Sequence, residues 1–396
     1  ARLFMGGIAF SLILYHEVRT NQLIYAVVIF GGIGTFYTVC GGIRAVIWTD
    51  VIQIIVVVGA ALISIYLLLD AIPLTVPQII EALRDNSAQG HSKIRIIDTS
   101  VDLSLPFTLW TGLAIVFLNM ASYGVDHDLA QRMLTCKTSW RGGLSLILSN
   151  VLGIPVVCLF LIIGLLLYVF YSRPDLMGAA APTDMIANAR QVYPQFLLNH
   201  LPTGLSGLAM VGLCAAAMSS FDSAVQAMAG SVVADLYLPW RRAKDRATHR
   251  QITPSATVRI SRWVVVVMGS LLTLFAVTTA LLLNSQTPLI EFALGIMAFA
   301  YAGLLGVFLA ARLTKRGNST SVLLALLAGA IAVLIMQPDI LPHVTQRLIG
   351  KEVKLAFAWW MVIGTVLSFL VCIVGRADVN APYHDVRPRF GSTTDL

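Results

Sequence analysis

The residues best suited to chemistry in this sequence are serines and a carboxylate inside a long apolar run. Ser219 and Ser220 are adjacent, Asp222 and Ser223 follow within one helical turn, and Ala216 lies one turn earlier on about the same face. Hydroxyl, carboxylate and main-chain carbonyl oxygens are the ligands that hard cations prefer. This pattern favours a cation site. The alternative is that the serines bond to carbonyls of their own helix and that the carboxylate lies in water near the helix end.

A second polar group interrupts the apolar pattern in the stretch GGIRAVIWTDVIQ, residues 41–53. We expect the paired glycines to end one helix and Thr49 to cap the next. Asp50 would then lie in the first turn, where the helix dipole favours a carboxylate. One interpretation is a capped cytoplasmic turn with a contact between Arg44 and Asp50. The other is that Asp50 is a carboxylate on the path of a cation.

A third group lies in LNMASYGVDHDLAQRML, residues 118–134. Asn119, Ser122 and Tyr123 have the spacing i, i+3, i+4, so they share one face of a helix. An amide, a hydroxyl and an aromatic ring on one face suit a small polar solute. The alternative is a polar helix end with an aromatic residue at the membrane interface.

The composition indicates which elements position these groups. Of the 396 residues, 57% are hydrophobic and 12% are charged, and the mean hydropathy is +0.81. A soluble protein is about one quarter charged, so we predict an all-α membrane protein, a multi-span helical bundle. The basic residues fall in short loops, which indicates membrane topology rather than nucleic-acid binding. We find no pattern for a nucleophile, a metal cluster or a phosphate-binding loop, so we predict that it is not an enzyme.

About ten apolar runs are long enough, or nearly so, to be membrane-spanning helices. We place them at residues 3–15, 23–39, 51–69, 107–123, 144–171, 205–236, 263–283, 289–309, 322–336 and 355–374. The first run is too short to span, so we expect the sequence to begin part-way through a helix. Residues 1–376 would form one transmembrane domain and residues 377–396 a disordered cytoplasmic tail. A short amphipathic helix is predicted over residues 77–84.

The distribution of positive charge sets the orientation. If the first run points outward, roughly two thirds of the 27 Lys and Arg fall on the inner side. We therefore expect the C-terminus to be cytoplasmic and the two longest polar segments, residues 70–105 and 172–204, to lie outside. The location would be the cell membrane, with the lipid bilayer as a partner.

The three groups, in this order, resemble the sodium:solute symporter family, which includes sodium–glucose, sodium–proline and sodium–sialic acid transporters. The matching stretches are GGIRAVIWTDVIQ, then YGVDHDLAQRML followed by Lys137, then LPTGLSGLAMVGLCAAAMSSFDSA ending in ADLY. Weaker similarity continues through GLLGVFLAARLTKR and the helix with Trp359 and Trp360. The resemblance runs from about residue 20 to about residue 375, and it is the combination of segments that is specific.

This resemblance implies a LeuT-type core of two inverted five-helix repeats, with its sites near the middle of the membrane. It implies a sodium site at the carbonyl of Ala216 and the hydroxyls of Ser219 and Ser220, with Asp50 near its cytoplasmic side. No other cofactor is implied. Relatives with a second cation site carry hydroxyls at the positions of Asp222 and Ser223, so a second site here would be altered by the aspartate.

The same resemblance implies that the solute is bound through Asn119, with Ser122 and Tyr123 in the place of an aromatic pair. The partner would be a sugar, sugar acid, amino acid or carboxylate, and the function sodium-coupled symport by alternating access.

Helices that precede the first run in the family are missing here, so the core would be N-terminally incomplete, and we do not expect the chain to transport alone. The alternative is a sensory membrane domain or an inactive truncated relative. The coding sequence on both sides would distinguish these.

Overall fold

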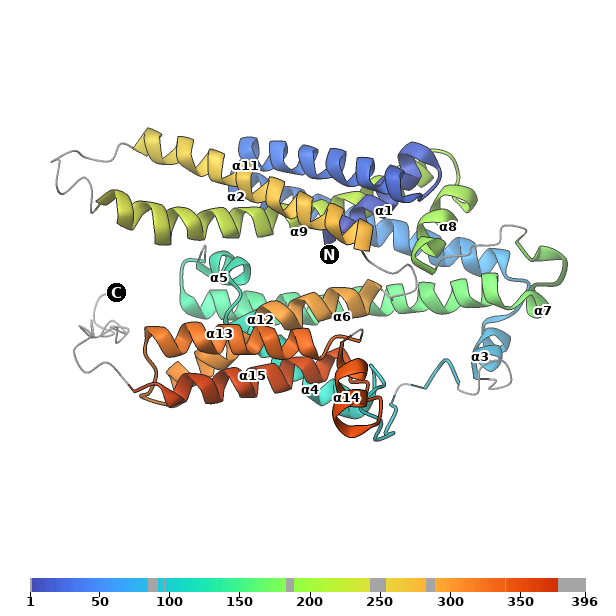
Figure 1. Cartoon of the computed structure of the whole chain (residues 1–396). Helices are drawn as coiled ribbons and strands as arrows, with labels where there is room; N and C mark the ends of the chain where they lie inside the picture. The colour runs from blue at the N-terminus through green and yellow to red at the C-terminus, as the bar shows by residue number, and fades with distance from the viewer. Residues whose placement is uncertain are drawn as a thin grey trace. The chain divides into compact units, whose positions relative to one another are not determined.

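The computed structural model describes residues 2–84, 92–95, 97–134, 136–182, 189–242, 254–282, 289–338 and 340–376. Within these ranges every regular element is a helix (Figure 1). The longer helices are α1 (Arg2–Tyr15), α2 (Thr20–Ala71), α4 (Leu109–Gly124), α6 (Ser139–Ser172), α9 (Leu205–Ser231), α11 (Pro254–Leu282), α12 (Leu289–Leu313), α13 (Ser319–Ile335) and α15 (Phe357–Val374). The shorter ones are α3 (Val76–Arg84), α5 (His127–Leu134), α7 (Pro174–Met177), η1 (Gly178–Ala180), η2 (Ala189–Gln191), α8 (Val192–His200), the π-helix η3 (Val232–Tyr237) and α14 (Leu341–Ile349).

The predicted apolar runs all fall in helices, apart from a few residues at their ends. Seven helical stretches in the described ranges are long and apolar enough to cross a membrane, and α1, α4 and α13 are shorter apolar helices. In a bilayer a helix satisfies all of its own backbone hydrogen bonds, which is why such runs become helical. The predicted amphipathic helix is confirmed as α3, whereas α5, α8 and α14 were not predicted. The predicted tail lies outside the described residues.

The chain divides into two compact units. The first contains Ala1–Asp98 and Asp126–Ile296, and the second contains Thr99–Val125 and Met297–Leu396. The residues proposed for the cation belong to the first unit, and those proposed for the solute belong to the second.

Helix α2 corrects one prediction. Every residue from Thr20 to Ala71 is helical, so the paired glycines do not end a helix and Thr49 does not cap a new one. The hydroxyl of Thr49 instead forms a 2.8 Å hydrogen bond with the hydroxyl of Tyr37. In a straight helix their α-carbons would be about 18 Å apart, further than the two side chains can bridge. The helix therefore bends back between them and forms two arms, Thr20–Gly41 and Trp48–Ala71, which accounts for both predicted spans.

The first unit is built around α9, which packs against α1, against α2 and against α11. Glycines allow close approach between these helices. A Cβ added at Gly212 of α9 would lie 2.7 Å from Cγ1 of Val56 in the second arm of α2. A Cβ at Gly6 of α1 would lie 2.6 Å from that of Ala217 in α9. The polar residues at the centre of α9 are therefore enclosed by neighbouring backbones.

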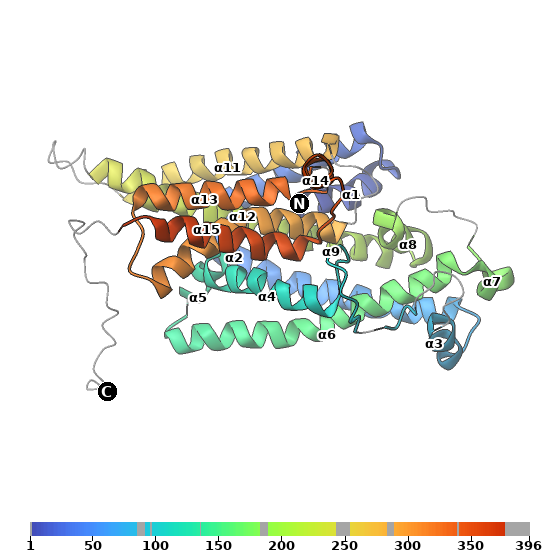
Figure 2. The same cartoon turned by 60° about the horizontal axis from the view of Figure 1, so that its bottom comes forward.

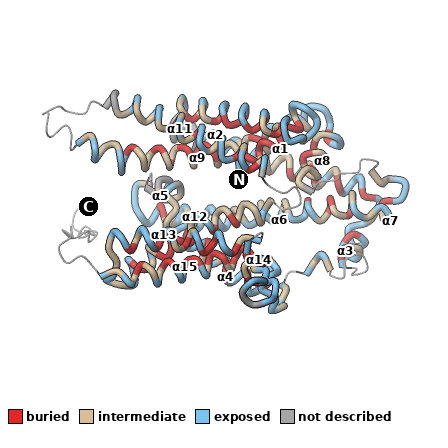
Figure 3. The backbone as a smooth tube through the Cα atoms, viewed as in Figure 1, coloured by how far each residue is buried: buried red, intermediate tan, exposed pale blue. Residues whose placement is uncertain are grey.

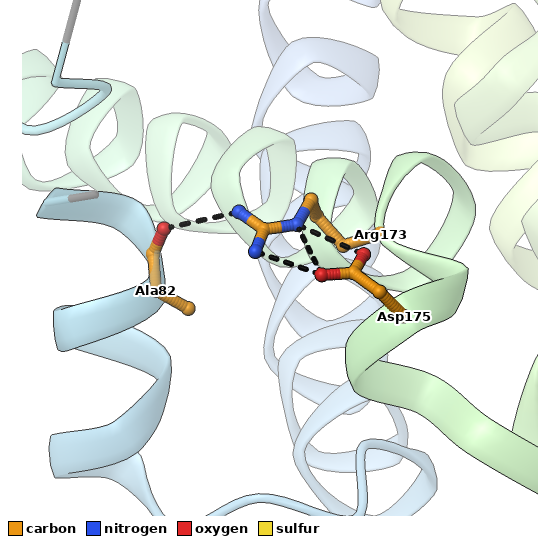
Figure 4. Close-up of polar contacts among 3 residues, drawn as sticks. All are labelled: Ala82, Arg173 and Asp175. Carbon is orange, nitrogen blue, oxygen red and sulfur yellow. Dashed lines mark hydrogen bonds and ion pairs between the residues drawn. The ribbon is translucent and has the colours of Figure 1, made fainter. Parts of the chain in front are cut away.

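A segment between the second arm of α2 and α4 packs against the far end of α6. In α3, Ile79 and Leu83 are each 4% exposed, and the guanidinium of Arg173 donates a 3.4 Å hydrogen bond to the carbonyl of Ala82 (Figure 4). The same guanidinium donates to the carboxylate of Asp175 at 2.9 Å, which lowers the pKa of that carboxyl group. This contact joins α3 to the junction between α6 and α7.

The second unit packs α13 against α15 and α4 against α15. Small residues again allow the helices to approach closely. A Cβ added at Gly329 would lie 2.7 Å from the α-carbon of Gly303. The hydroxyl of Ser368 donates a 3.0 Å hydrogen bond to the carbonyl of Gly303. The side chains at the centre of this interface are apolar or small, and none of those just named is charged.

Large apolar side chains also cover outward faces. In α6, Ile147, Ile154 and Leu161 are 62–63% exposed, and much of this helix is intermediate or exposed in Figure 3. A soluble protein avoids contiguous exposed apolar surface of this kind, so these faces are suited to lipid.

Candidate functional site

The polar residues predicted in α9 lie on a single helix at the centre of the first unit. Ser219 and Ser220 are half-buried, whereas Asp222 and Ser223 are 1% and 6% exposed. Ala216 is exposed, one turn before Ser219. The alternative in which Asp222 lies in water at the helix end is therefore wrong, because its carboxylate is enclosed by protein.

Asp50 is brought to α9 by the second arm of α2. The hydroxyl of Ser219 donates a short hydrogen bond to Oδ1 of Asp50. Ser219 thus donates to a carboxylate on another helix rather than to a carbonyl of its own helix. Two residues that are 169 positions apart in the sequence, and that were predicted independently, lie in direct contact. The predicted contact with Arg44 involves a side chain outside the described residues.

Asp222 is held from the other side, by the first arm of α2. The hydroxyl of Thr38, itself 3% exposed, lies 2.8 Å from Oδ1 of Asp222 and 2.9 Å from the carbonyl of Gly34. A Cβ added at Gly34 would lie 2.8 Å from the ring of Phe221, so this glycine permits the close approach of the arm. Sequence reasoning missed Thr38. The signal that could have found it is a hydroxyl inside an apolar run.

Gln53 is a second residue that the sequence analysis did not single out. It lies between two contacts of the second arm with α9, those of Asp50 with Ser219 and of Val56 with Gly212. Its amide oxygen Oε1 is buried and has no hydrogen-bond partner among the described residues. A buried acceptor without a donor is costly, so this oxygen is available to a ligand.

The arrangement collects oxygen atoms of three kinds around the centre of α9: two carboxylates, serine hydroxyls and a side-chain amide. Asp222 follows Ser219 by three residues, so the carboxylates of Asp222 and Asp50 lie near successive turns of one helix. Asp222 is buried and Asp50 is half-buried, and an ionised carboxylate that is buried needs a compensating positive charge. The donor set fits an alkali cation, for which oxygen atoms are the preferred ligands.

The predicted solute residues lie on α4 in the second unit. The helix covers Leu109–Gly124, so Asn119, Ser122 and Tyr123 share one face as expected. Asn119 is exposed, Tyr123 is 42% exposed and Ser122 is intermediate. The helix ends at Gly124, and α5 begins again at His127. These three residues belong to the second unit, whereas the residues around α9 belong to the first.

Comparison with known proteins gives a consistent result. The model of the sodium:solute symporter family matches residues 5–329. The human sodium/iodide cotransporter is 28% identical over 336 residues, covering 83% of this chain and 48% of that protein. The sodium/sialic acid symporter SiaT of Proteus mirabilis (strain HI4320) is 24% identical over 310 residues, covering 75% of this chain and 56% of that protein. The sodium/glucose cotransporter of Vibrio parahaemolyticus is 28% identical over 276 residues, covering 65% and 48%.

The fold is also found in a solved structure. A Na+-coupled sialic acid symporter in a substrate-bound outward-open state superposes with a TM-score of 0.69 at 20% identity, covering 94% of this chain and 69% of that one. The chain thus has the helical LeuT-type fold expected from its sequence. It spans about half the length of the curated relatives it matches.

These relatives are transporters and not enzymes. The match covers most of the chain, including all three polar groups, and the apolar helices identify a multi-pass membrane protein. The chain belongs to the sodium:solute symporter family.

Proposed function

We propose that this chain forms part of a symporter that couples the entry of sodium to the uptake of a small polar organic solute by alternating access. The observation that carries the proposal is the contact of Ser219 with Asp50 beside the buried Asp222 on α9. It collects oxygen ligands inside a bundle of membrane-spanning helices, where polar groups are costly and tend to be functional.

The first cation would bind at the carbonyl of Ala216 and the hydroxyls of Ser219 and Ser220, with Asp50 beside them. The hydroxyl of Ser219 donates its hydrogen bond to Asp50, so the lone pairs of its oxygen remain free to face a cation. The carboxylate then supplies charge without contacting the ion directly. Gln53 adds an uncommitted oxygen in the same region.

A second cation would be held by Asp222 and Ser223. Asp222 is almost fully buried, and Thr38 is the only hydrogen-bond partner found for it among the described residues. The enclosed carboxylate is a charged ligand for a cation. The family resemblance leads one to expect a hydroxyl at this position, which is a neutral ligand. The aspartate would therefore bind an ion more tightly than a hydroxyl would.

The solute would contact Asn119, Ser122 and Tyr123, whose amide, hydroxyl and ring share a face of α4. The relatives include proteins named for sialic acid, glucose and monocarboxylates. A sugar, sugar acid, amino acid or carboxylate would suit this set of groups, since each presents hydrogen-bonding oxygen or nitrogen atoms and a compact carbon skeleton.

Coupling requires that each ligand bind one conformational state better than the other. Sodium would enter from outside and favour the state that binds solute, and the two ligands together would favour closure and opening to the inside. Each charge that crosses gains about 2.3 kcal/mol per 100 mV of membrane potential. We further propose, from the positive charge on the loops, that the C-terminus is cytoplasmic and that the contact of Arg173 with Ala82 lies outside.

The test is the double substitution Ser219→Ala and Ser220→Ala in the complete protein, reconstituted in liposomes. Loss of two ligand oxygens should raise the sodium concentration for half-maximal uptake at least tenfold, since a hydrogen bond or ligand bond to a charge contributes about 1.5–3 kcal/mol. Insertion should be unchanged, because neither hydroxyl is needed to form the helix.

Ser145→Ala with Ser149→Ala is the matched control. Both of these serines donate to carbonyls of their own helix, α6, at 2.8 and 2.9 Å, so their loss should leave sodium activation as it is. Unchanged sodium dependence in the α9 double variant would refute the assignment.

A further inference from the structure

The positive charge of this chain is concentrated in one place. Between Leu236 and Arg262 the sequence has seven Lys or Arg and one Asp, a net charge of +6, while the whole chain has +7. All other residues together therefore contribute only +1. A topology signal needs an excess of basic residues on the inner side, but it does not require nearly the whole net charge in a single loop.

The structure places four of these arginines at one end of the first unit. Arg241 and Arg242 follow the π-helix η3 at the end of α9, and Arg259 and Arg262 lie in the first turns of α11. Helix α11 packs against both α9 and η3, and the two helix ends lie at the same end of the unit in Figures 1 and 2, in yellow-green and yellow. Arg242, Arg259 and Arg262 are exposed.

Two exposed tryptophans mark the level of the membrane surface beside these arginines. Trp240 is 58% exposed and its ring lies 6.2 Å from that of Tyr237. Trp263 is 66% exposed and begins the apolar run of α11. Tryptophan and tyrosine prefer the layer of lipid headgroups. In α11, Arg259 and Trp263 have the spacing i, i+4 and therefore share a face, with Arg259 one turn nearer the start of the helix.

We propose that these residues, Trp240, Arg241, Arg242, Arg259, Arg262 and Trp263, form a surface that binds the phosphate groups of anionic phospholipids in the cytoplasmic leaflet. Guanidinium groups pair with phosphate through two parallel hydrogen bonds, and the cytoplasmic leaflet carries the anionic lipids of the membrane. The tryptophans hold the helix ends at headgroup level, so the arginines meet phosphates rather than water or acyl chains. The inference rests on the orientation given under the proposed function, but not on transport.

The test is lipid binding by the complete protein in detergent, measured by native mass spectrometry with phosphatidylglycerol and, separately, with phosphatidylcholine. The wild type should retain phosphatidylglycerol in preference to phosphatidylcholine. The pairs Arg241→Gln with Arg242→Gln and Arg259→Gln with Arg262→Gln should each weaken phosphatidylglycerol binding about fivefold per arginine, which corresponds to about 1 kcal/mol for each basic residue near the surface.

Two further variants separate this surface from total charge. Arg→Lys at the same four positions keeps the charge but removes the paired guanidinium hydrogen bonds, so it should weaken binding, though less than the Gln substitutions do. Removal of the same number of charges by Arg312→Gln, in the last turn of α12, with Arg316→Gln, just after that helix, should leave phosphatidylglycerol binding unchanged. Equal losses in this control and in the two pairs would overturn the proposal, as would wild-type affinity in both pairs.

A final experiment tests the orientation of the chain in the membrane and the kind of partner that the surface binds. Cysteine labelling of the two Gln pairs from each side of the membrane shows whether the topology is kept, and each pair is judged only against a wild type of the same topology. If lipid binding is unchanged in both pairs but a cytoplasmic protein no longer co-purifies, the surface serves a protein and the lipid assignment is wrong. Because no sodium or solute gradient is applied, the result is independent of the Ser219 and Ser220 test.

Discussion

Two helix interfaces in this molecule solve the same packing problem with different residues. Where α9 meets the arms of α2, glycines allow close approach. Asp222 and Thr38 are buried between these helices, and Asp50 and Ser219 are half-buried there. Where α12, α13 and α15 meet, glycines again allow close approach, but the groups between them are small or apolar. The second interface shows that helices can pack closely at glycines without a carboxylate between them. Close packing alone therefore does not account for the carboxylates of the first interface, which agrees with the cation site proposed above.

The largest effect that this comparison predicts is on the apolar interface. A Cβ at Gly306 would lie 2.6 Å from that of Ser368, 2.7 Å from the carbonyl oxygen of Thr365 and 2.8 Å from the amide nitrogen of Phe369. Backbone atoms cannot move aside cheaply, so Gly306→Ala should lower the free energy of unfolding by about 3 kcal/mol. Unfolding in sodium dodecyl sulfate, followed by tryptophan fluorescence, measures this.

Gly112→Ala is the control, because a Cβ there meets no atom within 4 Å; it should be neutral or slightly stabilising in a helix. If Gly306→Ala is as stable as the wild type, close packing does not hold the second unit together and the comparison fails.

The next effect concerns the polar interface. Thr38→Val keeps the shape of the side chain and removes the hydroxyl that lies 2.8 Å from Oδ1 of Asp222. The buried carboxylate would lose its hydrogen bond, which should cost about 2 kcal/mol of unfolding free energy. Thr278→Val is the matched change: Thr278 is exposed and donates to the carbonyl of Leu274 in its own helix. Equal effects of the two substitutions would mean that Asp222 does not depend on Thr38.

The smallest effect separates folding from ion binding. Asp222→Asn keeps the size of the side chain and an acceptor for Thr38, but removes the charge. Stability should change by less than about 1 kcal/mol, while the sodium concentration for half-maximal uptake should rise about tenfold, which corresponds to about 1.4 kcal/mol. Asp235→Asn in the exposed part of η3 is the control. A loss of stability as large as that of Gly306→Ala, with sodium activation intact, would make the carboxylate part of the fold instead.

Much of the fold was predictable because a membrane-spanning helix is specified by the composition of its own segment. The apolar runs, the amphipathic α3 and the break after Gly124 follow from local pattern. Local pattern did not predict that helix α2 continues through its paired glycines. The tertiary contacts of its two arms outweigh the tendency of glycine to end a helix. Helices α5, α8 and α14 were missed because they are short and only partly apolar.

The candidate site was predicted as a list of residues and not as a set of contacts. Ser219, Asp50 and Asp222 stand out because polar residues in apolar runs are unusual. That Ser219 meets Asp50, and that Thr38 meets Asp222, depends on the way α2 turns back along α9, which no local pattern encodes. Gln53 was overlooked because a single amide near the end of a run is common, and only its buried, unpaired oxygen distinguishes it.

The reversal of α2 links the two carboxylate contacts mechanically. Thr38 lies in the first arm and Asp50 in the second, and the residues between the arms are helical. A change in the angle between the arms would therefore lengthen or shorten the Thr38–Asp222 and Asp50–Ser219 contacts together. Ion sites formed by two unconnected helices would lack this constraint. In this chain, a cation bound at one of the two proposed carboxylate sites is expected to change the geometry of the other, because a single bend of the backbone connects them.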